Sequence, residues 1–94
     1  MKLQGKQKFK HADHIAWRRV EQESVILDLN TSDYYSLSET GALIWESLGA
    51  GHSVEHVKEI VCRQYDIEPS VLHKHMESLV EQLVQDGLLH ALGS

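Results

Sequence analysis

The hydrophobic periodicity of this 94-residue chain changes once, near Ser38, and this change limits the possible folds more than any other feature. Before it, apolar and polar residues alternate, as at Val25, Leu27 and Leu29, which is typical of strands with one buried face. After it, apolar residues recur every three or four positions, which is typical of amphipathic helices. Strands followed by helices predict an α+β domain with the helices on one side of a small sheet.

Capping residues place these elements along the chain. We expect an antiparallel meander of three strands, at residues 15–20, 24–29 and 34–37, with short polar turns between them. Three helices follow: Ser38 and Ser53 are candidate N-caps of the first two, and Pro69 fits the first turn of the third. Gly87 is the expected cap at the end of the third helix. The apolar residues beyond it, Leu88, Leu89 and Leu92, are expected to fold back onto the core.

Charge is divided unevenly along the chain, which carries 9 basic and 14 acidic residues and a net charge of −5. Residues 1–20 hold six basic residues and one acidic residue (+5), and residues 21–94 hold three and thirteen (−10). An acidic body repels phosphate backbones, so we expect no nucleic-acid partner. We expect residues 1–12 to be a flexible basic tail and residues 13–92 to be the folded domain. The alternative role for the tail is to steer an acidic partner.

The single cysteine, Cys62, excludes an internal disulfide and fits a reducing cytosol. No apolar run approaches the roughly 18–20 residues that cross a bilayer. No apolar stretch follows the basic start, which argues against a secretory signal. We therefore expect a cytoplasmic protein that does not enter a membrane.

No group of residues in the sequence indicates catalysis. His52 and His56 have a spacing that can place two metal ligands on one helical face, but Ser53 as the cap puts His52 before the helix, and no third ligand follows. Cys62 lies beside an apolar stripe, as a half-buried structural thiol would. No glycine-rich phosphate loop is present. We expect a protein that is not an enzyme and holds no metal or cofactor.

The third expected strand, residues 33–37, lies at an edge of the sheet. Its unpaired amide and carbonyl groups could accept an extended peptide as a further strand, beside an amphipathic helix. Alternatively, its short length and Asp33 simply protect this edge from other strands. The residues alone favour neither possibility.

Two adjacent motifs carry a family resemblance: Val-Ile-Leu-Asp-Leu at 25–29, and Tyr-Tyr-Ser-Leu-Ser-Glu-Thr-Gly-Ala-Leu-Ile-Trp at 34–45. Together they resemble the PqqD-like family of peptide-recognition elements. Weaker matches at 53–55, 65–67 and 85–89 extend the resemblance over roughly residues 14–90. The chain departs from the family pattern at Ser38, where Asn is usual, and at Ser32, where Gly is common; both are conservative as cap and turn residues.

The resemblance implies a winged-helix-like domain that binds the leader segment of a ribosomally synthesised precursor peptide. The leader would add to the third strand, in the groove beside the third helix. The peptide-binding residues implied on this chain are Asp33, Tyr34, Tyr35, Ser36, Leu37, Val71, Leu72, His75, Met76 and Leu79. The domain would present the leader to a separate enzyme. That enzyme would be a radical S-adenosylmethionine (radical SAM) enzyme of pyrroloquinoline quinone synthesis or a leader peptidase of lasso-peptide maturation.

Two other functions stay open: a winged-helix DNA-binding regulator, and a subunit that only holds an enzyme together. Against the first, the third helix carries Lys74 opposed by three acidic residues, Glu77, Glu81 and Asp86. The sequence also predicts where four apolar or aromatic side chains lie. Tyr34 and Tyr35 should face opposite sides of the sheet, and Met76 fits either the core or the groove. Trp45 is expected in the core.

Overall fold

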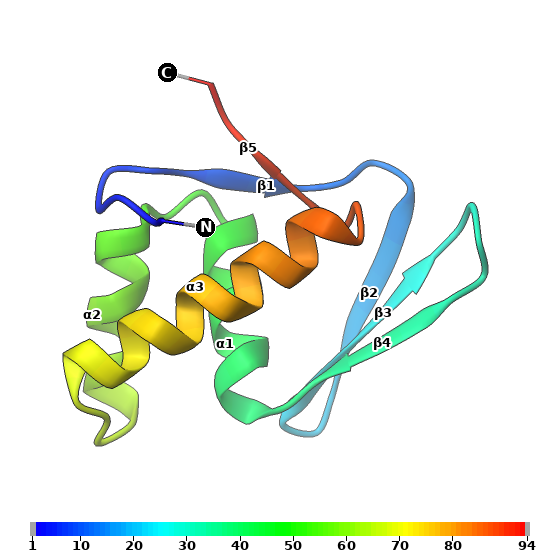
Figure 1. Ribbon diagram of the computed structural model, residues 1–94. Helices are drawn as coiled ribbons and strands as arrows, with labels where there is room; N and C mark the ends of the chain where they lie inside the picture. Colours follow the sequence, from blue (N-terminus) through cyan, green and yellow to red (C-terminus); the bar gives the residue numbers. More distant parts are fainter. Residues whose placement is uncertain (1, 94) are drawn as a thin grey trace.

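Figure 1 shows the computed structural model of the chain, which describes residues 2–93. A three-stranded antiparallel sheet has the order β2-β3-β4, with β2 at Ile15–Val20, β3 at Glu23–Asp28 and β4 at Tyr34–Leu37. Three helices follow: α1 at Glu39–Gly49, α2 at Val54–Gln64 and α3 at Pro69–Gln85. The expected α+β fold, a three-stranded antiparallel sheet followed by three helices, is confirmed.

Both turns of the sheet contain a residue in the left-handed backbone region. The β2–β3 register pairs Val20 with Glu23, and Glu21 in the turn between them has a φ of 58°. Such two-residue turns match the twist of the strands that they join. Ser32, in the β3–β4 turn, has a φ of 66°. Since glycine adopts this conformation at little cost, the backbone explains why Gly is common at this position.

The helix ends follow the expected capping residues closely. The Ser53 hydroxyl accepts a hydrogen bond from the His56 N–H at 3.2 Å, and α3 begins at Pro69. Gly87 follows α3 with a left-handed φ of 75°. Ser38 occupies the N-cap position of α1, but its side chain makes no capping hydrogen bond.

Helix α1 is the centre of the core. Its side chains Ile44, Trp45 and Leu48 are fully buried, and Ile26 of β3 meets them from the sheet. The helices lie on one face of the sheet (Figure 1). Trp45 is therefore the core anchor expected from the sequence.

A second, two-stranded sheet joins the two ends of the chain. Strand β1 (Phe9–His11) pairs antiparallel with β5 (Leu89–Ala91), close to both termini (Figure 1). Leu3, Phe9 and Ala12 are 5%, 1% and 4% exposed. Residues 2–12 thus contribute a strand and three buried apolar side chains, which differs from the flexible tail expected from their charge. The reason is that three apolar side chains of this lysine-rich segment fit into the core.

No helix within residues 2–93 has both the length and the apolar character needed to cross a membrane.

Candidate functional site

Strand β4 has an open edge. It pairs with β3 on one side, and nothing else in residues 2–93 pairs with its other side. The Asp28 N–H donates to the Asp33 carbonyl at 2.9 Å, so Asp33, and Tyr35 two residues further on, direct their backbone groups toward β3. Because these directions alternate in antiparallel pairs, the N–H and C=O groups of Tyr34 and Ser36 point outward. These groups can pair with an additional strand.

The side chains of β4 divide between the two faces of the sheet. Tyr35 and Leu37 are partly buried and pack against the core, on the helix side. Tyr34, 73% exposed, and Ser36 lie on the opposite face. The two tyrosines therefore face opposite sides as expected, and Tyr35 is the one on the helix side.

Gly41 of α1 lies between Leu37 of β4 and Leu79 of α3. A Cβ atom added to Gly41 would lie 3.6 Å from Cβ of Leu37 and 3.7 Å from Cδ2 of Leu79. The strand and the helix therefore approach each other over a buried residue that has no side chain. A larger side chain here would occupy the space between Leu37 and Leu79.

A mostly apolar hollow of about 340 Å³, which we call the groove, lies between the start of α1 and the start of α3. Its lining residues are Ser38, Thr40, Ile67, Val71, Leu72 and His75. Val71 is 58% exposed at its mouth. The hollow can accept an apolar side chain of a bound peptide.

The structure places the implied α3 residues at different depths. Val71 and His75 are exposed and line the groove, and Leu79 is partly exposed outside it. Leu72 is 1% exposed and Met76 is fully buried. Both side chains belong to the core. Met76 could have been in the core or in the groove, and the structure places it in the core.

Four residues at or near the groove were not among those implied by the sequence: Ser38, Thr40, Gly41 and Ile67. Ile67 precedes α3 and Thr40 is in the first turn of α1, so their approach depends on how the two helices pack. The local signal was Gly41 itself, a glycine inside a helix, which often marks close packing.

The end of β4 at Asp33 and Tyr35 is negatively charged. Burial, and then the carboxylates of Asp86, Asp33 and Asp28, raise the pKa of the Tyr35 hydroxyl. The phenol therefore stays neutral and can donate a hydrogen bond at physiological pH. A basic side chain in a bound peptide would be favoured at this end.

Two features considered for chemistry lie outside the groove. His52 and His56 stack edge to face with their Nδ1 atoms 3.1 Å apart, but no group of three potential metal ligands occurs among the residues that the structure describes. The thiol of Cys62 is half-buried and donates to the Ile67 carbonyl at 3.7 Å. Cys62 is thus half-buried, as the sequence predicted.

The fold and the open strand edge together define a class of protein: a small winged-helix-like domain with an open edge at β4 and an apolar hollow at the start of α3. The chain belongs to the PqqD family, described as Coenzyme PQQ synthesis protein D, whose pattern matches residues 23–89. Among curated proteins, no sequence matches the chain.

Two solved structures share this fold. A lasso peptide synthetase B1 complexed with the leader peptide is 28% identical, with a TM-score of 0.79 over 92% of this chain and 99% of that chain. TbiB1 in complex with the TbiA(beta) leader peptide is 24% identical, with a TM-score of 0.82 over 90% of this chain and 99% of that chain. Because its identity is only 24%, the comparison with TbiB1 supports the fold alone.

Proposed function

We propose that this chain binds the leader segment of a ribosomally synthesised precursor peptide and presents it to a separate maturation enzyme. The leader adds as a strand beside β4, pairing with the outward backbone groups of Tyr34 and Ser36. The open edge of β4 is the observation that carries this proposal, and the apolar hollow at the start of α3 supports it. It gains support from the similar lasso peptide synthetase B1, which is itself complexed with a leader peptide.

The maturation enzyme that fits this comparison is the leader peptidase of a lasso-peptide pathway. The radical SAM enzyme of pyrroloquinoline quinone synthesis is the alternative that the family description offers. The domain acts without catalysing a reaction, in the cytoplasm, where precursor peptides are synthesised. The DNA-binding alternative is disfavoured by the acidic residues of α3, Glu77, Glu81 and Asp86, because nucleic-acid affinity comes mostly from phosphate neutralisation.

The energies of strand addition suit a reversible complex. Each new backbone hydrogen bond contributes about 0.5–1.5 kcal/mol, and one apolar side chain in the hollow contributes about 1.5–3 kcal/mol. Ordering the peptide costs about 2–5 kcal/mol. After the loss of translational freedom, the expected dissociation constant is micromolar to nanomolar.

A leader titration with two matched variants tests the proposal. Val71→Glu places a carboxylate at the mouth of the hollow, in the first turn of α3, where the helix dipole favours acidic residues. Val20→Glu makes the same change at an exposed valine of β2, far from the open edge of β4. Fluorescence anisotropy of a labelled leader should show about tenfold weaker binding for Val71→Glu and unchanged binding for Val20→Glu.

Thermal unfolding of both variants checks that they are folded. Absence of saturable binding to the original chain below about 1 mM would exclude leader binding. Equal losses in the two folded variants would show that the groove beside α3 is not the site.

A further inference from the structure

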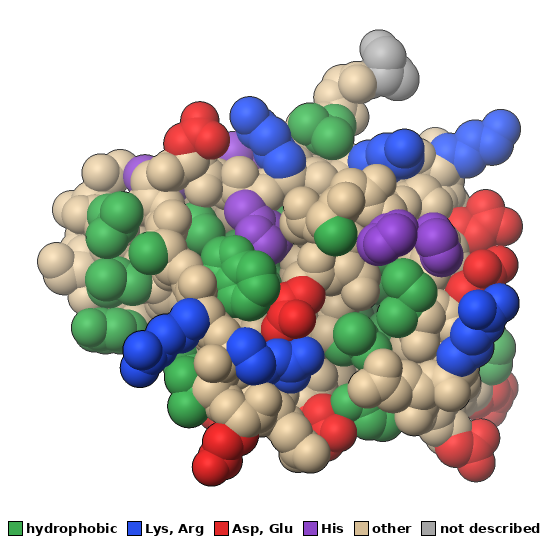
Figure 2. Space-filling model, turned by 180° about the vertical axis from the view of Figure 1, so that it is seen from behind, with side chains coloured by type: hydrophobic (Ala, Val, Ile, Leu, Met, Phe, Trp, Pro, Cys, Tyr) green, Lys and Arg blue, Asp and Glu red, His purple; other side chains and the backbone are tan. Residues whose placement is uncertain are grey.

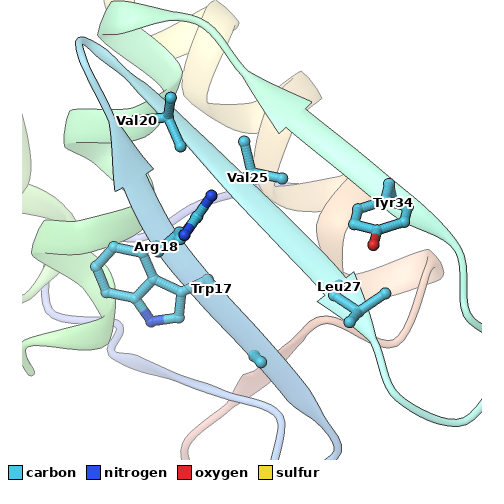
Figure 3. Close-up of a pocket in the computed structure, with 7 residues that line it drawn as sticks. Trp17, Arg18, Val20, Val25, Leu27 and Tyr34 are labelled. Atoms are coloured by element: carbon cyan, nitrogen blue, oxygen red, sulfur yellow. The ribbon is translucent and has the colours of Figure 1, made fainter.

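The face of the sheet turned away from the helices is mostly apolar. Figure 3 shows its side chains around a shallow hollow of about 320 Å³. We call this surface the outer sheet face: its side chains around the hollow are Ala16, Arg18, Val20, Val25, Leu27 and Tyr34, and the polar pair Glu23 and Ser36 lies on the same face beside them. Strand alternation places these side chains opposite those that pack on the core. No helix of residues 2–93 covers them (Figure 1).

The strand register aligns these side chains in rows across the whole sheet. Ala16 lies opposite Leu27, which lies opposite Tyr34, and the row ends at the open edge of β4. Val20 is 41% exposed and Tyr34 is 73% exposed. Seen from behind, apolar side chains gather over the sheet beside Lys and Arg side chains (Figure 2). An uncovered apolar face with a polar border is typical of a protein-binding surface.

Arg18 favours a partner protein with a negatively charged side chain at this surface. Its neighbour Arg19 pairs with Glu46 at 2.8 Å, whereas Arg18 has no ion pair or hydrogen bond within residues 2–93. Arg18 also lies beside the apolar side chain of Val25, its partner in the register. A carboxylate from another protein would pair with the guanidinium, and the apolar surroundings would strengthen the bond.

We propose that the outer sheet face is the docking surface for the maturation enzyme, which presents apolar side chains around an Asp or Glu that pairs with Arg18. This inference rests on the proposed function. Besides the charge, its support is continuity with the leader site. A strand added to β4 extends the sheet, and its alternate side chains lengthen the row of Ala16, Leu27 and Tyr34.

Continuity of the two surfaces has a thermodynamic consequence. The side chains of the leader then serve two purposes: one set enters the groove beside α3, and the other set faces the enzyme. The enzyme contacts the domain and the leader together, so each of the two binds more tightly when the other is present. The enzyme would thereby prefer the loaded domain to the empty one.

The test uses the leader-processing enzyme encoded beside the precursor as the probe. Its affinity is measured by calorimetry, with and without saturating leader, for the original chain, Arg18→Glu, Val20→Glu and Arg63→Glu. Arg63 is an exposed arginine of α2, so its substitution is the control for charge reversal. We expect the enzyme to bind the loaded original chain more tightly than the empty one. Arg18→Glu and Val20→Glu should each weaken enzyme binding about tenfold or more and leave leader affinity unchanged, and Arg63→Glu should change neither.

Two results would overturn the inference and leave leader binding intact. In one, the enzyme does not bind the original chain, or binds Arg18→Glu and Val20→Glu equally well. In the other, sedimentation shows that the chain self-associates through this face. The variants would then lose self-association and still bind the enzyme with unchanged affinity. A failure of the original chain to bind the leader would instead refute the proposed function.

Discussion

At the scale of single residues, His11 shows how the start of the chain is fixed to the core. Its ring stacks on Trp45 with centroids 3.6 Å apart and an angle of 8° between the planes, and Trp17 meets it edge-on. Its Nε2–H donates to the Trp45 carbonyl at 2.9 Å. A Cβ atom on Gly49 would overlap the imidazole, so a glycine at this position makes room for the ring.

His11 should make stability depend on pH. Burial lowers the pKa of its imidazole from 6.5, against opposing effects of the Trp45 carbonyl and the Glu46 carboxylate. The unfolded chain therefore binds more protons near and below that pH, so the stability of the folded chain is retained above pH 6.5 and falls as the pH decreases.

Thermal unfolding between about pH 7 and pH 5 measures this effect. His11→Phe keeps the aromatic stack and removes the titration, so the variant should lose less stability on acidification than the original chain. The six other histidines are common to both proteins, and the difference between the two curves isolates His11. Parallel curves would contradict the assignment.

The sequence predicts those residues whose role depends on local geometry. Alternation along a strand separates Tyr34 from Tyr35, and the preferences of caps identify Ser53 and Gly87. Leu72 and Met76 show the limit of such reasoning. They share a helical face with accessible residues, and only the packing of α3 against the other helices decides that both are buried.

At the scale of secondary-structure elements, the open edge of β4 allows a test of backbone pairing. Ser36→Pro removes an N–H that points away from β3, and proline is tolerated on edge strands at such positions. Ser36→Ala keeps the N–H and loses only the hydroxyl that donates to Glu23 at 3.0 Å. If the leader pairs with β4, the proline variant should bind it roughly 2- to 10-fold more weakly, the equivalent of one hydrogen bond, and the alanine variant should bind it normally. Equal affinities measured by calorimetry would argue against strand addition.

Strand β1 and its partner β5 are the elements that the sequence does not reveal as strands. Strand β1 has three residues, two of them with cationic or titratable side chains, and β5 lies at the other end of the chain. A periodicity analysis has too few residues to detect such a strand, whereas the three helices and the β2–β3 hairpin carry long, regular patterns. The buried side chain of Phe9 makes this element essential to the core.

Substitutions in β1 measure this contribution. Phe9→Ala should lower the free energy of unfolding by about 3–5 kcal/mol because it leaves a cavity in the core. Lys10→Ala changes the neighbouring exposed residue and should alter it by less than about 0.5 kcal/mol. Chemical denaturation of both variants compares them. Similar small losses would mean that residues 1–12 are the flexible tail that their charge suggests.

At the scale of the whole molecule, the two faces of the sheet differ in what covers them. Helices pack on the inner face, and no helix of residues 2–93 covers the outer face from β2 to β4 (Figure 1). The sequence predicts the fold and the strand at the site because both follow from periodicity and turn residues. The outer sheet face could not be predicted, since it depends on which side of the sheet the helices pack.

Amide hydrogen exchange of the chain with saturating leader is the most direct test of strand addition to β4. The Tyr34 and Ser36 amides should become protected because both point toward the added strand. The other open edge is an internal control: since the Leu29 N–H donates to the His14 carbonyl, the Trp17 and Arg19 amides of β2 point outward in the same way. We predict that their exchange stays unchanged. Protection at Trp17 and Arg19 in place of Tyr34 and Ser36, or at neither edge while binding saturates, would contradict addition of the leader as a strand beside β4.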